Sequence, residues 1–202
     1  MRLGIFGGTF DPPHVGHLIL ADEARVQLGL EHVLWVLTPN PPHKMDQAIT
    51  PLVDRLDMLR AALGDALHFE LSRVDIDRPP PHYAVDTVRL LRRRHPDDTL
   101  VYLIGADSLV ELPTWHMPRK FVLACDEIGV MRRHGEVPDL EALEGVLPGL
   151  KDRLRWVQAP LVEIASTQIR EAVSGGGAFR YELPPEVYRI ICQRGLYSSQ
   201  DC

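Results

Sequence analysis

Short apolar runs recur along this chain with helical patterns between them, and this alternation constrains the fold more than any other feature. Val33–Leu37 and Leu100–Ile104 are nearly continuously apolar, without the polar alternation of a strand that faces water. Such runs are typical of strands covered on both faces. We expect strands at Leu3–Phe6, Val33–Leu37, His68–Leu71, Leu100–Ile104 and Glu127–Met131, with a short further strand near Arg155–Val157.

Helical patterns fill most of the intervals. Thr50 has the character of an N-cap, with Pro51 in the first turn. The leucines at positions 52, 56, 59 and 63 then share one helical face. The expected helices are His17–Leu28, ended by Gly29, the segment that starts at Pro51, and Tyr83–Arg94; Glu136–Leu150 is expected to be a variable surface segment.

Strands that alternate with helices predict right-handed crossovers and a parallel sheet. The expected fold class is therefore α/β, with a doubly wound parallel sheet. The chain contains no internal repeat, low-complexity tract or Ser/Gly linker that would divide it. We expect a single domain over residues 1–202, with a helical C-terminal part from about residue 160.

Composition narrows the class of protein. Of the 202 residues 45% are hydrophobic and 25% are charged, with a net charge of −6, so nothing global favours a nucleic-acid or membrane partner. The three cysteines show no C-x-x-C spacing, which favours a reducing compartment. The sequence shows no leader and no apolar stretch of about 18 residues, so we expect a cytoplasmic location.

The loop after the first expected strand runs from Gly7 to His17 and reads G-G-T-F-D-P-P-H-V-G-H. Ligands of open parallel sheets bind beyond the carboxyl ends of the strands. Glycines let a backbone approach a ligand closely. His14 and His17 are three residues apart at a helix start, so both imidazoles face one way, and Gly16 between them leaves room for a ligand. The pattern therefore predicts a site for phosphate oxygens.

Two familiar phosphate motifs are missing, because the loop contains neither G-x-G-x-x-G nor G-x-x-x-x-G-K-[ST]. Metal ligation is an alternative use of the two histidines, but Asp11 supplies the nearby carboxylate and the spacing differs from the i, i+4 pair of zinc proteases. We expect no dedicated metal site. A glycine turn with two surface histidines is the plainest alternative.

The same loop resembles the H-x-G-H motif of the nucleotidyltransferase superfamily, in the fuller form found in bacterial nicotinate-nucleotide adenylyltransferases. Three later segments are also similar to that family, in the same order along the chain. They are P-P-H-K at 41–44, I-G-A-D with the following Trp115 at 104–115, and I-A-S-T-Q-I-R at 164–170.

That resemblance implies a Rossmann-like nucleotidyltransferase fold and a reaction in NAD biosynthesis. ATP and nicotinate mononucleotide (NaMN) would give deamido-NAD and pyrophosphate, with Mg²⁺ entering with ATP. Catalysis of this kind needs alignment of two polyanions and stabilisation of charge rather than a nucleophilic residue.

The resemblance also implies roles for individual residues. His14, His17 and Arg170 would be catalytic. ATP would be bound by Gly7, Gly8, Thr9, Phe10, His14, Gly16, His17, Gly105, Asp107, Ser166, Thr167 and Arg170, with Ser166 and Thr167 capping a helix that ends near Ser174. NaMN would be bound by Thr9, Lys44, Tyr83, Ala84, Thr87, Asp107 and Trp115.

The chain departs from the family pattern at two places. Ala165 stands where the family usually has serine, and His82-Tyr83-Ala84 stands where it usually has Ser-Tyr-Thr, a segment that contributes to recognition of the nicotinate carboxylate. Selectivity for NaMN over its amide, nicotinamide mononucleotide (NMN), is therefore open, as is the oligomeric state. The alternatives are another transferase of the superfamily, such as pantetheine-phosphate adenylyltransferase, and a nucleotide sensor without turnover.

Overall fold

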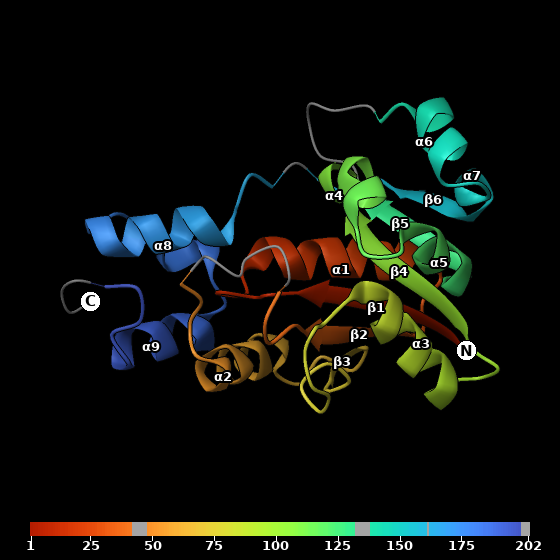
Figure 1. Ribbon diagram of the computed structural model, residues 1–202. Helices are drawn as coiled ribbons and strands as arrows, with labels where there is room; N and C mark the ends of the chain where they lie inside the picture. The colour runs from red at the N-terminus through yellow and green to blue at the C-terminus, as the bar shows by residue number, and fades with distance from the viewer. Residues whose placement is uncertain (42–47, 132–137, 161, 199–202) are drawn as a thin grey trace.

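The computed structural model describes residues 1–41, 48–131, 138–160 and 162–198, and its centre is a six-stranded sheet (Figure 1). The strand order is β3-β2-β1-β4-β5-β6, and every neighbouring pair is parallel. The predicted doubly wound parallel sheet is confirmed. The strands are β1 (Arg2–Gly8), β2 (His32–Leu37), β3 (Phe69–Ser72), β4 (Thr99–Gly105), β5 (Glu127–Met131) and β6 (Leu154–Val157).

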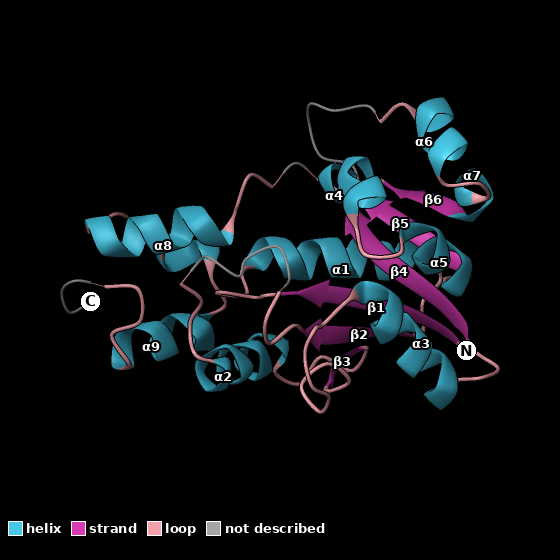
Figure 2. Ribbon diagram, in the orientation of Figure 1, coloured by secondary structure: helices cyan, strands magenta, loops and turns pink. Residues whose placement is uncertain are grey.

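Helices connect the strands and extend the chain beyond the sheet (Figure 2). The longer helices are α1 (Val15–Gln27), α2 (Leu52–Leu63), α3 (Ala84–Arg94), α8 (Ser166–Gly175) and α9 (Pro185–Gln193). The shorter ones are α4 (Ala106–Glu111), α5 (Pro118–Ala124), α6 (Leu140–Val146) and α7 (Leu150–Arg153), with 3-10 turns η2 (Leu112–Thr114) and η3 (Arg180–Glu182).

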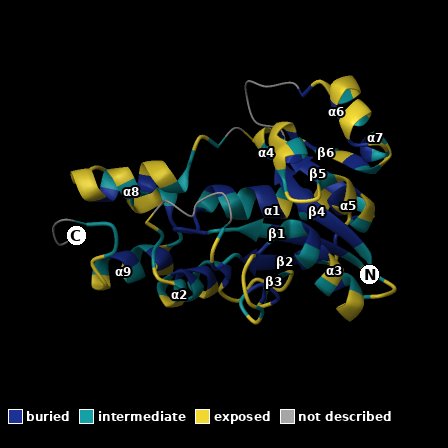
Figure 3. Cartoon of the chain, viewed as in Figure 1, coloured by how far each residue is buried: buried dark blue, intermediate teal, exposed yellow. Residues whose placement is uncertain are grey.

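The sheet separates two cores, and its central strands contribute alternate side chains to both. On β2, Leu34 and Val36 pack with α3, α4 and α5, whereas Val33, Trp35 and Leu37 pack with α1 and α2. The fully covered strands are dark blue in Figure 3. Strands buried on both faces explain the unbroken apolar runs of the sequence.

A third core lies beyond the carboxyl ends of β1 and β2, where α8 and α9 lie in Figure 1. It joins Met58 of α2 to Ile169 and Val173 of α8 and to Val187 and Ile191 of α9. Most of the remaining surface of α8 is exposed (Figure 3). The C-terminal helices therefore sit at the edge of the sheet where ligands are expected.

Three predictions about local structure are wrong. Thr50 is not the cap of α2, because Pro51 is the N-cap and the Thr50 N–H donates to the Asp11 carboxylate. Ser166 and Thr167 do not cap α8, because Ala165 is its extended N-cap residue and Ser166 is already helical.

The third concerns Glu136–Leu150, whose described part starts at residue 138. It holds α6, whose N-cap Asp139 accepts two backbone N–H bonds of 3.0 Å from Glu141 and Ala142. Three leucines of the segment are buried against the sheet. One lies in α6, one directly follows it and one starts α7, so the segment packs against the sheet at three points. They are Leu143, Leu147 and Leu150.

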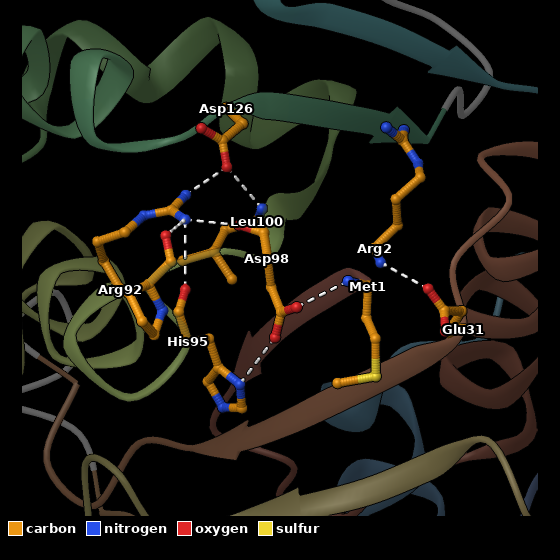
Figure 4. A network of polar contacts seen from close by, with 9 residues as sticks. Met1, Arg2, Glu31, Arg92, His95, Asp98, Leu100 and Asp126 are labelled. Atoms are coloured by element: carbon orange, nitrogen blue, oxygen red, sulfur yellow. Dashed lines mark hydrogen bonds and ion pairs between the residues drawn. The ribbon is translucent and has the colours of Figure 1, made fainter.

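The amino ends of the strands are held by a network of ion pairs (Figure 4). The Met1 amino group lies 2.7 Å from Asp98 Oδ1, and His95 Nδ1 lies 3.2 Å from the other oxygen of that carboxylate. The Asp126 carboxylate accepts from the Leu100 N–H at 2.7 Å and pairs with Arg92. These contacts fix the edge of the sheet opposite the ligand-binding edge. Within the described ranges, no helix is long and apolar enough to cross a membrane.

Candidate active site

A cavity of about 290 Å³ opens where β1, β2 and β4 approach their carboxyl ends, which is the point at which the strand order reverses. Its volume is close to the lower limit of about 300 Å³ for small-ligand sites, so it suits one part of a nucleotide. We call it the aromatic cavity. It is lined by Gly7, Gly8, Thr9, Val36, Thr38, Pro41, Asp75, His82, Tyr83, Ala84, Thr87, Tyr102, Ser108, Trp115 and His116.

Aromatic rings form two walls of this cavity. The Trp115 ring packs against Tyr102 and Phe121, with ring centroids 6.4 and 5.2 Å apart. The Tyr83 ring stacks on His116 with centroids 3.9 Å apart and an interplanar angle of 17°. Flat, polarisable walls favour a flat heteroaromatic ligand. The structure thus brings the predicted residues Tyr83, Ala84 and Trp115 to one place.

A polar network forms part of the cavity wall. The Thr87 hydroxyl donates to Asp75 Oδ1 at 2.7 Å, and the Arg78 guanidinium donates to the same oxygen at 3.0 Å. Asp75 and Thr87 are both buried. The hydroxyl of Thr87, which we predicted to bind a ligand, is therefore already engaged by a protein carboxylate.

The loop Gly7–His17, called the glycine–histidine loop below, continues from the cavity to the start of α1. His14 is the N-cap of α1, and its ring stacks on that of His17 with centroids 3.7 Å apart and an angle of 29°. The His14 N–H donates to His17 Nδ1 at 3.2 Å. A neutral His17 ring therefore carries its proton on Nε2, which is a hydrogen-bond donor.

Two residues of this loop serve packing as well as binding. The Phe10 ring is buried between Phe6 and Trp35, with centroids 5.7 and 5.2 Å away, so the backbone of Phe10 rather than its ring is left for a ligand. A Cβ at Gly16 would lie 3.0 Å from His14 Nδ1. Glycine at position 16 therefore lets the His14 ring pack closely against the backbone.

Helix α8 reaches the glycine–histidine loop from more than 150 residues away in the sequence. The Ser166 hydroxyl donates to the Pro12 carbonyl at 2.8 Å, and Arg170 Nη1 donates to the Asp11 carbonyl at 2.8 Å. Arg170 Nη2 also contacts the Thr167 hydroxyl at 3.3 Å. No side chain caps the N-terminus of α8. Its first backbone N–H groups are therefore available to an anion beside the loop.

Comparison with known proteins agrees with this geometry. A match to the cytidylyltransferase-like family covers residues 5–172. A probable nicotinate-nucleotide adenylyltransferase of Thermomicrobium roseum is 45% identical over 97% of this chain and 91% of the relative. One of the same name from a Roseiflexus species is 41% identical over 96% and 97%. The chain belongs to the nicotinate-nucleotide adenylyltransferase family.

The fold has a solved counterpart in that family. The nicotinic acid mononucleotide adenylyltransferase of Plasmodium falciparum, in complex with NaAD, has a TM-score of 0.78 to this chain. The likeness covers 97% of each chain at 17% sequence identity, so it bears on the fold alone. The resemblance identified from four sequence motifs is confirmed, and so is the Rossmann-like fold that it implied.

The family motif at the end of β4 places Asp107 in the first turn of α4, where the carboxylate is exposed. A Cβ at Gly105 would lie 2.2 Å from Asp107 Oδ1. Glycine at 105 is therefore required for the Asp107 carboxylate to fold back over the end of the strand. The P-P-H-K motif includes Lys44, which lies outside the described residues.

Sequence reasoning missed the residues that hold the glycine–histidine loop in place. Arg55 is 2% exposed and donates to the carbonyls of Thr50, Thr9, Thr38 and Pro39 at 2.7–3.0 Å. Burial lowers the pKa of Arg55, and the Asp11 carboxylate opposes that shift. Arg55 precedes Leu59 by one helical turn on the buried side of α2, and a charge on that side was the available signal.

Asp11 is the second missed anchor. Its Oδ1 accepts from the Tyr197 hydroxyl at 2.7 Å and its Oδ2 from the Thr50 N–H at 3.2 Å. Both oxygens are thus engaged, which disfavours the alternative of a metal held by Asp11 and the two histidines. Within the described part of the chain, no three His, Cys, Asp or Glu residues are grouped to hold a metal ion.

Proposed function

We propose that this chain catalyses adenylyl transfer from ATP to nicotinate mononucleotide, giving deamido-NAD and pyrophosphate. One observation carries the proposal, which is that a single glycine loop joins a phosphate-type site to a cavity with aromatic walls. The names of the full-length relatives support the same reaction. The acceptor's phosphate oxygen forms a bond to the α-phosphorus of ATP, and the bond to pyrophosphate breaks with its electron pair leaving on pyrophosphate.

The phosphate-type site suits the ATP side of this reaction. His14 and His17 are placed at the N-terminus of α1, and Arg170 and the first N–H groups of α8 approach from the other side. Donors fixed around a transferring phosphoryl group stabilise the charge that builds up in the transition state. We assign the catalytic role to His14, His17 and Arg170, and ATP binding to these together with Gly7, Gly8, Thr9, the Phe10 backbone, Gly16, Gly105, Asp107, Ser166 and Thr167.

The aromatic cavity suits the pyridine ring of the acceptor. Trp115 and Tyr83 would contact the ring faces, and the Ala84 N–H at the start of α3 would face its carboxylate. Asp107 would accept a ribose hydroxyl, and Lys44 would meet the acceptor phosphate. Thr9, which lines the cavity, would contact both substrates, and Thr87 would contribute through its hydrogen bond to Asp75.

The proposal extends to the setting of the reaction. Mg²⁺ would arrive with ATP, held by phosphate oxygens and water, because the described residues offer no carboxylate cluster to cage it. Residues 1–202 would act as one nucleotidyltransferase domain in the cytoplasm, with ATP and NaMN as the small-molecule partners and no nucleic-acid or membrane partner.

The direct test is release of pyrophosphate by the purified protein with Mg-ATP and one acceptor at a time. We expect rapid release with NaMN and little with phosphopantetheine. Equal release with NMN would keep the chemistry and change the acceptor specificity. Release with phosphopantetheine alone would identify another transferase of the superfamily. ATP binding without turnover of any acceptor would contradict the proposal in favour of a nucleotide sensor.

A further inference from the structure

His82 is a buried histidine in the wall of the aromatic cavity. The reaction proposed above assigns it no role. It is 5% exposed, lines the cavity and directly precedes Tyr83, the N-cap of α3. Its Nδ1 is buried and, within the described residues, has no hydrogen-bond partner. A buried polar atom without a partner is destabilising, so one retained beside a ligand cavity points to a partner on the ligand.

The backbone on both sides of His82 is held by one arginine. Arg78 Nη1 donates to the Pro81 carbonyl at 2.6 Å, and Nη2 contacts the Tyr83 carbonyl at 3.4 Å. Arg78 is fixed in turn by its ion pair with Asp75, at 3.0 Å. A backbone held in this way does not have to become ordered when a ligand binds, which favours specific recognition by the residue that it carries.

The backbone donors beside His82 favour an anionic ligand group. The Asp75 carboxylate, which would repel such a group, is ion-paired with Arg78 and accepts a hydrogen bond from the Thr87 hydroxyl. The adjacent N-terminus of α3 has no side-chain cap, and Ala84 in its first turn lines the same cavity. Backbone donors and the positive end of the helix dipole thus face the same space as the ring.

We propose that His82 is a specificity-determining residue, whose Nδ1–H donates a hydrogen bond to the carboxylate on the pyridine ring of the acceptor. This inference rests on the proposed function, because it takes NaMN as the acceptor. The carboxylate of NaMN accepts from the ring and from the Ala84 N–H together. The carboxamide of NMN presents a neutral oxygen and an N–H₂ group, so it matches this set of donors less well.

The test compares His82→Leu, which removes the donor, with His82→Asn, which keeps an amide N–H near the position of Nδ1. We measure kcat and KM for NaMN and NMN on each protein. For His82→Leu we expect kcat/KM for NaMN to fall about 10- to 100-fold, mainly through KM, with less than about a threefold change for NMN. His82→Asn should recover a large part of the loss.

His116→Ala is the matched control, because His116 lines the same cavity but is exposed and stacks on Tyr83. It should affect both acceptors equally. ATP affinity, measured alone, should stay unchanged in the His82 variants and so verify folding. An equal loss for NaMN and NMN in His82→Leu would overturn the inference while leaving the proposed function intact. Failure of the unmodified protein to use either nucleotide would overturn both.

Discussion

The glycine–histidine loop and the aromatic cavity share residues 7–9, yet their polar groups are satisfied in different ways. In the loop, Arg55 binds the Thr9 carbonyl, Arg170 binds the Asp11 carbonyl, and Tyr197 binds the Asp11 carboxylate. In the cavity, the walls are aromatic and the buried Nδ1 of His82 has no partner among the described residues.

This difference matches the tasks proposed for the two regions. Phosphoryl transfer depends on donors that are already in position when charge develops, so the loop that places them is held by the protein itself. Discrimination between an acid and an amide depends on donors that only the correct ligand satisfies. The comparison predicts that substitutions around the loop affect stability and turnover, whereas those in the cavity affect the choice of acceptor.

The largest expected effect is that of Arg55→Leu. Four backbone carbonyls would lose their donor in a buried site, so we expect the free energy of unfolding to fall by about 3–5 kcal/mol, measured by urea titration. Arg189→Leu is the control, since Arg189 pairs with Glu186 on the exposed side of α9 and should change stability by less than about 1 kcal/mol. Similar losses in both variants would show that Arg55 does not hold the loop.

His17→Ala tests whether the glycine–histidine loop stabilises the transition state. If the imidazole acts mainly in the transition state, kcat should fall about 100- to 1000-fold while the Kd for ATP changes by less than about tenfold. His95→Ala, at the opposite edge of the sheet (Figure 4), should leave both unchanged. Parallel losses in kcat/KM and ATP affinity would mean that His17 binds only the ground state.

The sequence predicted a functional role for His17 but none for Arg55. His17 was identified because the loop motif is contiguous and follows a recognisable strand. Arg55 was missed because its partners are the backbone carbonyls at positions 9, 38, 39 and 50. Every residue has a backbone carbonyl, so the residue types at these positions do not indicate that a buried donor is needed. Helix periodicity indicated the leucines of α2 but gave no reason for a buried guanidinium among them.

The same distinction applies to the fold. All six strands were predicted, because a strand that is covered on both faces has a nearly continuous apolar sequence. Helices α4 and α5 were not assigned, since each has only six or seven residues and Pro113 and Pro118 mark the segment between them as irregular. The contact of Tyr197 with Asp11 spans 186 residues, and no local pattern predicts a contact at that separation.

Tyr197→Phe gives a smaller effect on the loop. The variant removes the 2.7 Å hydrogen bond to Asp11 but leaves the Thr50 N–H on the other carboxylate oxygen. We expect a loss of about 1.5–3 kcal/mol in unfolding free energy, because the acceptor is a buried carboxylate, together with a modest fall in kcat. Tyr181→Phe, at a 92% exposed ring, should change neither. Unaltered stability in Tyr197→Phe would show that the C-terminal segment does not anchor the loop.

The smallest expected effect is a pH dependence that arises in the aromatic cavity. Burial, and secondarily the Arg78 charge, lower the pKa of His82 below its ordinary value of 6.5, while Asp75 acts in the opposite direction. The unfolded chain therefore binds a proton at His82 more readily than the folded chain does. The stability tied to neutral His82 is complete above about pH 6.5 and is lost as the pH falls through the folded-state pKa.

Thermal unfolding between pH 8 and 5 therefore separates the two regions. The midpoint of the unmodified protein should fall more steeply below pH 6.5 than that of His82→Asn, which has no titrating group at this position. Tyr197→Phe should keep the steeper slope, since His82 is intact in it. Identical slopes for the unmodified protein and His82→Asn would show that His82 titrates alike in both states, and would remove the electrostatic contrast between cavity and loop.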